Sequence, residues 1–191
     1  DDKEYTNEVI NGDIHTANQK LAGLESRDQA KTFIYALLYG AGDEKLGSVA
    51  SAGRAAGQTL RKRFMSNLTA YADLKDRIVR ESEQETIEGL DGRLLHVRSA
   101  HSALNTLLQS AGAIVMKKAM CLLEEYATMW KLDYYFVGNI HDEVQAEVRA
   151  DHADKYGRLA VSCLEAAGIE LGLNCKLTGE YQVGSSWADT H

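Results

Sequence analysis

The spacing of apolar and polar residues along the chain predicts a protein made mostly of helices. The longest helix is expected from Ser102 to Tyr126, because apolar residues recur there every three or four positions. Three further helical segments are expected: a short one that ends near Gly23, a run over residues 44–83 that is broken around Gly53 and Gly57, and an amphipathic one from Asp154 to Gly168.

Another helix is expected from Arg27 to Tyr39, and both of its ends carry sequence signals. Ser26 and Gln29 stand three apart, as in a capping box, and Gly40 follows as a stop. At about 100° per residue, its apolar residues share one arc that should face the core, and its charged and phenolic residues share another arc of roughly 120°. The apolar set is Ala30, Phe33, Ile34 and Leu37, and the second set is Arg27, Lys31, Tyr35 and Tyr39.

The second set is a candidate binding surface for phosphate. Arg27 and Lys31 place two cations near the start of a helix, where they oppose the helix dipole unless an anion neutralises them. A triphosphate would serve, because arginine and lysine are common phosphate ligands. The alternative is a solvated basic face with half-buried tyrosines, and the spacing alone leaves both interpretations open.

Two strands are expected near residue 140. Tyr134 to Val137 is rich in aromatic and β-branched residues, and apolar and polar residues alternate from Val144 to Arg149. The two runs flank a short polar segment, which predicts a hairpin with His141 and Asp142 near its turn. A Gly-Leu-Asp-Gly turn at residues 89–92 is followed by a shorter candidate strand at residues 94–97. The fold class is therefore α+β, mostly helical.

Two further groups of polar residues could carry chemistry. Asp142 and Glu143 place carboxylates at a tight turn, where they can hold Mg²⁺ through oxygen or can simply be solvated. Asn105 and Gln109 interrupt an apolar helix one turn apart, where they can bind a base edge or sugar, or can hydrogen-bond to a neighbouring helix. Arg93 lies in a basic cluster ahead of that helix.

Composition narrows the class of protein. A chain of 191 residues without a linker-like stretch fits one domain or two small subdomains. The net charge of −7 argues against non-specific nucleic-acid binding by bulk charge but allows a local basic cleft.

Three cysteines without a C-x-x-C spacing argue against a disulfide scaffold or a zinc site and favour the cytoplasm. No apolar run approaches the length of a membrane span, so no membrane partner is expected.

These features together resemble family A DNA polymerases, in particular the replicative polymerases of short-tailed bacteriophages. The resemblance covers essentially the whole chain and is carried by motifs in a fixed order. The motifs are Gly12-Asp13-Ile14-His15-Thr16, Arg27-x-x-x-Lys31-x-x-x-Tyr35-x-x-x-Tyr39-Gly40, Gly89-Leu90-Asp91-Gly92-Arg93, Asn105-x-x-x-Gln109-Ser110-Ala111-Gly112 and His141-Asp142-Glu143.

The resemblance implies a role for each matched position. The Arg27 helix would be the fingers helix that closes over a dNTP, with Arg27 and Lys31 on the β- and γ-phosphates. Lys31 would also act as general acid toward pyrophosphate, and His15 and Tyr35 would complete the nucleotide site. Asp142, with help from Glu143, would hold Mg²⁺ in a two-metal site for attack of the primer 3′-hydroxyl on the α-phosphate. The implied primer–template contacts are Tyr39, Gly40, Arg93, Asn105, Gln109 and His141.

The resemblance also implies that part of the enzyme lies outside this chain. The family's other metal-binding aspartate stands in a D-x-S-x-x-E-x-R-like segment, which nothing here matches. We therefore expect residues 1–23 to lead from palm to fingers, residues 24–85 to be fingers and residues 86–191 to be C-terminal palm. On this view the isolated chain is inactive and needs a missing N-terminal polymerase half. The alternative is a non-catalytic module that binds nucleotide or primer–template.

Overall fold

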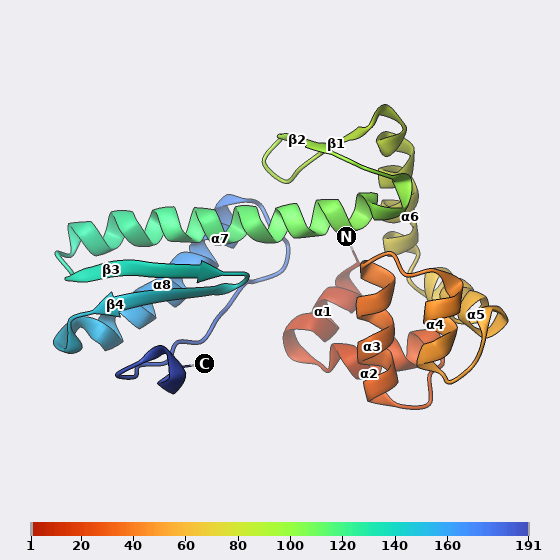
Figure 1. The fold of residues 1–191 in the computed structure, drawn as a ribbon, viewed down its shortest axis with the longest axis horizontal. Coiled ribbons are helices and arrows are strands. Elements are labelled where there is room, and N and C mark those ends of the chain that lie inside the picture. Colours follow the sequence, from red (N-terminus) through yellow and green to blue (C-terminus); the bar gives the residue numbers. More distant parts are fainter. Residues whose placement is uncertain (1, 191) are drawn as a thin grey trace. The chain divides into compact units, whose positions relative to one another are not determined.

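In the computed structural model, residues 2–190 are described, and they form helices and two small antiparallel sheets (Figure 1). The α-helices are α1 (Lys3–Asn11), α2 (Ile14–Ala22), α3 (Arg27–Leu38), α4 (Asp43–Val49), α5 (Arg54–Asn67), α6 (Thr69–Glu81), α7 (Ala103–Met129) and α8 (Ala153–Glu170). The strands are β1 (Thr86–Glu88), β2 (Leu94–His96), β3 (Tyr134–Ile140) and β4 (Glu143–Val148), and short 3-10 turns are η1 (Ser82–Gln84), η2 (Ala100–Ser102), η3 (Ala150–His152) and η4 (Trp187–Asp189). The predicted α+β, mostly helical class is confirmed.

The chain divides into two compact units between Leu108 and Gln109, and α7 passes from one unit into the other. Each unit has its own hydrophobic core. This division does not coincide with the three segments expected from the sequence. The assignment of residues 1–23, 24–85 and 86–191 to lead-in, fingers and palm remains a prediction.

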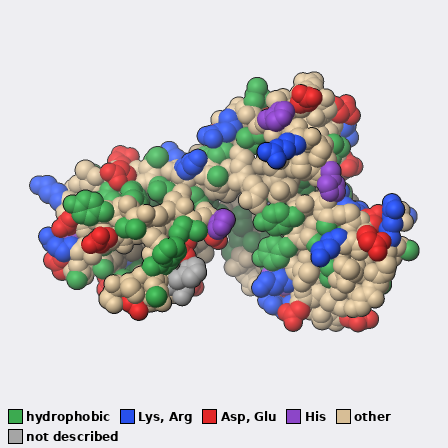
Figure 2. Space-filling view, in the orientation of Figure 1, with side chains coloured by type: hydrophobic (Ala, Val, Ile, Leu, Met, Phe, Trp, Pro, Cys, Tyr) green, Lys and Arg blue, Asp and Glu red, His purple; other side chains and the backbone are tan. Residues whose placement is uncertain are grey.

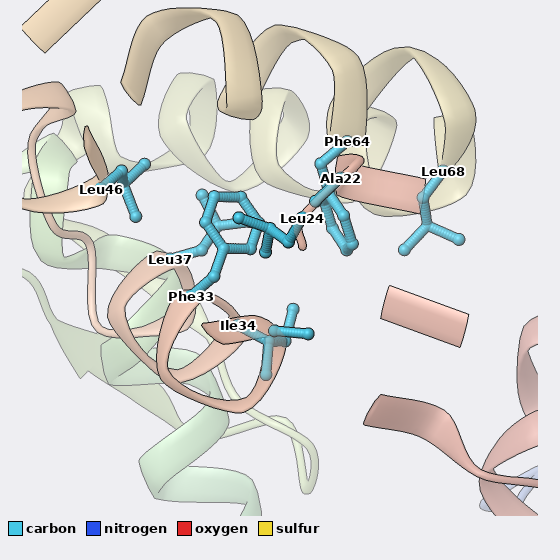
Figure 3. Close-up of a cluster of buried hydrophobic side chains, with 9 residues drawn as sticks. Ala22, Leu24, Phe33, Ile34, Leu37, Leu46, Phe64 and Leu68 are labelled. Atoms are coloured by element: carbon cyan, nitrogen blue, oxygen red, sulfur yellow. The ribbon is translucent and has the colours of Figure 1, made fainter. Parts of the chain in front are cut away.

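Helices α2 to α5 of the first unit enclose its main core (Figure 3). The apolar face of α3 supplies Phe33 and Leu37, and Leu46 and Phe64 enter from α4 and α5. The rings of Phe33 and Phe64 meet edge to face, with centroids 5.7 Å apart. Each large apolar side chain buried in this way contributes about 1.5–3 kcal/mol. The core therefore buries one face of α3, and the opposite face is exposed to solvent.

A second cluster in the first unit packs the β1–β2 hairpin against helices. Ile78 of α6, Ile87 of β1 and Ala103 at the start of α7 are buried together. Gly92 has a φ of 81°, which only glycine adopts without strain, so the turn predicted at residues 89–92 is confirmed.

The second unit packs the β3–β4 hairpin with α8 and the C-terminal part of α7 (Figure 1). Leu123 from α7 and Leu159 from α8 are buried here, and Phe136 and Ala146 from the hairpin pack against the cluster. The ring centroids of Tyr134 and Tyr156 lie 4.9 Å apart. The hairpin is antiparallel, with Ile140 opposite Glu143, so His141 and Asp142 form its turn as predicted.

Several local predictions need correction. Gly57 does not break a helix but lies buried inside α5, because α5 packs so closely on α4 that an added Cβ would stand 1.8 Å from the Asp43 carbonyl oxygen. The break predicted around Gly53 is confirmed, because α4 and α5 are separated by residues 50–53, and a second break falls at Leu68 and not at Gly57. Helix α1 and strand β1 were not predicted, because α1 buries none of its residues and β1 has only three.

The expectation about membranes also needs qualification. By length and composition alone, the helical stretch Ala100–Met129 contains an 18-residue window that is apolar enough to cross a membrane. Only 22% of that window is buried within the described residues. One such helix is weak evidence for a membrane span, because long core helices of soluble proteins have the same composition.

Candidate functional site

The exposed face of α3 carries the residues expected to bind phosphate. The Ser26 hydroxyl accepts the backbone N–H of Gln29, and the Gln29 side chain accepts the backbone N–H of Ser26, so the predicted capping box is confirmed. Because the apolar side is fixed in the core, Lys31, Tyr35 and Tyr39 face outward, and the two tyrosines are 49% and 60% exposed. Figure 2 shows hydrophobic side chains beside Lys or Arg side chains over this part of the first unit.

Arg27 is held by the carboxylate of Asp13, a contact that was not predicted from the sequence. Its Nε and Nη2 donate to the two oxygens of Asp13, at 2.8 and 3.2 Å. Asp13 also caps α2, because it accepts the backbone N–H of His15 and the hydroxyl of Thr16. The hydrogen bond from Arg27 is the main cause of a lowered pKa of Asp13, and the same pair raises the pKa of Arg27.

The start of α2 therefore lies beside the α3 face. His15 and Tyr35 come within 6.4 Å, measured between ring centroids. The Nδ1 of His15 is buried and makes no hydrogen bond within residues 2–190. The structure thus gathers four predicted nucleotide-site residues on neighbouring helices of one unit, namely His15, Arg27, Lys31 and Tyr35.

Lys31 is the cation of this face without a counter-ion. It is exposed and forms no ion pair or hydrogen bond with any described residue. Gly40 ends α3 with a φ of 77°, and an added Cβ there would stand 2.8 Å from the carbonyl oxygen of His101. Gly40 is therefore required by both its conformation and the close approach of the chain that leads into α7.

The other predicted primer–template residues are more dispersed. Arg93 forms an ion pair with Asp91 in its own turn at 2.6 Å, and this pair raises the pKa of Arg93 and lowers that of Asp91. Asn105 and Gln109 lie four residues apart on α7, Asn105 half-buried in the first unit and Gln109 exposed in the second. Arg93 thus lies in the turn before β2, and Asn105 and Gln109 lie on α7.

The β3–β4 turn presents two consecutive acids in different environments. Asp142 is exposed, and its carboxylate has no hydrogen-bond or ion-pair partner in the described part of the chain. Glu143 is half-buried, and its Oε1 accepts the side-chain amide of Gln145 and the indole N–H of Trp187, the latter at 3.1 Å. His141 precedes them with a φ of 57°, in the left-handed region.

These residues alone do not make a metal site. Within residues 2–190 no group of three or more His, Cys, Asp or Glu is arranged to hold a metal ion. Carboxylate oxygens are the ligands that Mg²⁺ prefers, and Asp142 is free to provide them. Because Mg²⁺ needs six ligands, a complete site would require further oxygens from water, substrate or another part of the protein.

Three contacts of the candidate residues were not predicted from the sequence. Asp13 is the partner of Arg27, His101 packs on Gly40, and Trp187 reaches Glu143. An aspartate at a helix start is a signal for a cap, which is how Asp13 could have been noticed. The contacts of His101 and Trp187 join distant parts of the sequence and leave no local signal.

Comparison with known proteins identifies the class to which this fold and these side chains belong. Residues 5–189 match DNA polymerase family A, and the chain belongs to that family. It is 41% identical to the DNA-directed DNA polymerases of Enterobacteria phage T3 and Escherichia phage T7, with the whole of this chain and 30% of each relative covered. It is 42% identical to that of Escherichia phage Phieco32 over 98% of this chain and 32% of the relative.

A solved structure has the same fold. The polymerase domain of Pol1 from M. smegmatis, in complex with DNA primer-template and dNTP, matches with a TM-score of 0.77 at 18% identity, over 87% of this chain and 33% of that chain. The chain thus spans about a third of the length of its relatives. The expected resemblance to a family A polymerase segment is confirmed.

Proposed function

We propose that this chain is the C-terminal portion of a DNA-directed DNA polymerase and that it binds dNTP and primer–template. Catalysis of nucleotidyl transfer then needs an N-terminal partner segment that supplies the second metal-binding aspartate. Residues 24–85 act as fingers and residues 86–191 as C-terminal palm, in the cytoplasm. Membership of family A and the 30% coverage of the phage enzymes support this proposal.

The observation that carries the proposal is the exposed face of α3. An unpaired Lys31 ammonium and two exposed phenols stand on one side of a helix whose other side is buried. An exposed lysine without an ion-pair partner can bind an anion without first losing a contact. The triphosphate of a dNTP supplies the matching negative charge, and Tyr35 then lies one helical turn further along, beside the sugar.

Arg27 joins this site by exchanging one anion for another. Its ion pair with Asp13 is exposed, with side chains 52% and 42% accessible to solvent. Exposed ion pairs contribute little to stability and are opened easily. A polyphosphate carries more charge than one carboxylate and accepts the same forked hydrogen bonds. Asp13 therefore holds Arg27 in position until the nucleotide arrives.

The β3–β4 turn supplies the carboxylates proposed to bind the metal. Asp142, with Glu143 beside it, would hold Mg²⁺, which supplies charge stabilisation for the attack of the primer 3′-hydroxyl. Lys31 can donate a proton to the leaving pyrophosphate from the phosphate side. Arg93, Asn105, Gln109, His141, Tyr39 and Gly40 are proposed to contact primer and template.

The competing function is a non-catalytic module that binds nucleotide or primer–template. The test uses a chimera, called here the completed polymerase, in which this chain replaces the matching 30% of the phage T7 enzyme. In it, Lys31→Ala is expected to raise the dNTP KM at least tenfold, because a charge-assisted contact contributes about 1.5–3 kcal/mol. Lys20→Ala, which removes another exposed lysine of the first unit, should leave KM within twofold, as expected for a surface residue. Equal KM values for both variants would contradict the proposed role of α3.

A further inference from the structure

The C-terminal turn η4 reaches the acidic end of the β3–β4 hairpin within the second unit. The indole Nε1 of Trp187 donates to Oε1 of Glu143 at 3.1 Å, across 44 residues of sequence. The side-chain amide of Gln145 donates to the same oxygen. Figure 1 shows the dark-blue C-terminal turn next to the hairpin. One oxygen of Glu143 is therefore held by two donors from different segments.

The turn that carries Trp187 is itself firmly built. Oδ2 of Asp189 accepts the backbone N–H and the hydroxyl of both Ser185 and Ser186, at 2.8 to 3.0 Å. An added Cβ at Gly184 would stand 2.5 Å from Cβ of Asp189, so the chain closes tightly around this carboxylate. A hydrogen-bonded turn therefore holds the indole, although the residue Trp187 is 52% exposed.

The two acids of the hairpin, Asp142 and Glu143, therefore differ in their hydrogen-bond partners. Donors on Glu143 fix its side chain and disperse part of its negative charge, whereas Asp142 has no such partners. His141, just before them, takes a left-handed conformation that is unfavourable for a residue with a side chain. Anchoring Glu143, the first residue of β4, stabilises this turn from outside the hairpin.

We propose that Trp187 is a positioning residue: through Glu143 it fixes the β3–β4 turn so that Asp142 alone presents a free carboxylate to the metal. The proposal rests on the proposed polymerase function. It assigns Glu143 to the support of the turn, and it gives the C-terminal turn a part in metal-dependent synthesis.

The first test is made on the 191-residue chain without any assay of activity. The chain has two tryptophans, so its spectrum of ¹⁵N-labelled indoles has two signals. Glu143→Ala should shift the Trp187 signal strongly and Glu143→Gln less, because glutamine keeps an accepting oxygen. Trp130, whose ring lies 4.8 Å from the Lys155 ammonium, is the internal control and should not move. An unmoved Trp187 signal in Glu143→Ala would overturn the proposal.

The second test uses the completed polymerase. Trp187→Phe removes the N–H and keeps an aromatic ring. The variant is expected to lower kcat about tenfold, because this factor corresponds to the free energy of one hydrogen bond to a charged group. The Mg²⁺ concentration for half-maximal activity should rise, while dNTP KM and primer–template affinity stay within twofold. Trp130→Phe should leave all four quantities unchanged. The double variant with Glu143→Ala should lose no more than Glu143→Ala alone, because both changes remove the same contact.

The outcomes separate this proposal from the polymerase function itself. If Trp187→Phe matches the unmodified enzyme in kcat and Mg²⁺ dependence while Asp142→Ala is inactive, the positioning role is wrong and the polymerase function stands. If Trp187→Phe lowers only thermal stability or DNA affinity, Trp187 is a structural residue and the positioning role is wrong. If Asp142→Ala keeps full activity, both proposals fail.

Discussion

Single residues of the candidate site differ mainly in whether their charge is already paired. Arg27 and Arg93 each have an aspartate partner, whereas Lys31 and Asp142 have none among residues 2–190. Unpaired charges on an exposed surface are available to a ligand without first losing a contact. Lys31 and Asp142 are therefore the residues whose removal should affect function most and folding least.

Tyr35 provides the most specific prediction at this scale. Its phenol is half exposed, one turn beyond Lys31, where the sugar of a bound dNTP would lie. In the completed polymerase, the hydroxyl can replace a hydrogen bond that is lost with the 3′-hydroxyl of a dideoxynucleotide. Because one such bond contributes about 1–3 kcal/mol, Tyr35→Phe should reduce relative dideoxynucleotide incorporation roughly ten- to a hundredfold. Competitive incorporation assays measure this ratio, and an unchanged ratio would make Tyr35 structural.

The ion pair of Arg27 and Asp13 predicts a pH dependence of stability. A lowered aspartate pKa means that the carboxylate stabilises the fold at neutral pH and that this contribution is lost as the pH falls below about 4. Asp13→Asn keeps an oxygen to cap α2 and removes the charge. Urea unfolding should show the variant less stable than the unmodified chain at pH 7, with a smaller difference at pH 3. A difference that does not change with pH would contradict this account.

Among the helices and strands, α3 and the β3–β4 hairpin could be predicted because their signals are local. A cap, a stop glycine and an apolar arc define α3 within 15 residues (Ser26 to Gly40), and alternation with a polar turn defines the hairpin. The partners of these elements could not be predicted, because Asp13, His101 and Trp187 come from other parts of the chain. Gly57 was misinterpreted for the same reason: its packing partner is the backbone of another helix.

The packing of α4 against α5 gives a prediction at the scale of these elements. Gly57→Ala places a methyl group against the Asp43 carbonyl and should destabilise the chain by about 2 kcal/mol, as overpacking does. Gly112→Ala is the matched control, because Gly112 is exposed on α7 with no atom within 4 Å of the added Cβ. It should stabilise the chain by up to about 1 kcal/mol through helix propensity. Equal effects in denaturant unfolding would show that α5 does not pack on α4 through Gly57.

On the scale of the whole molecule, the candidate residues are divided between the two units. The first unit has the α3 face, and the second has the hairpin acids. The second unit also exposes Tyr135, Val137 and Ile169 by more than two thirds of their surface. In a chain that spans about a third of its relatives, we propose that the missing portion covers such surfaces and supplies the remaining metal ligand.

The measurement that tests this account most directly is primer extension by the completed polymerase. Extension is expected from the chimera, and none from this chain alone or from the phage T7 portion alone, because on the proposed assignment neither would hold both metal-binding carboxylates. Asp142→Ala in the chimera should reduce kcat by orders of magnitude and leave primer–template affinity within a few-fold. Robust extension by the isolated chain, or full activity of the Asp142→Ala chimera, would contradict the account.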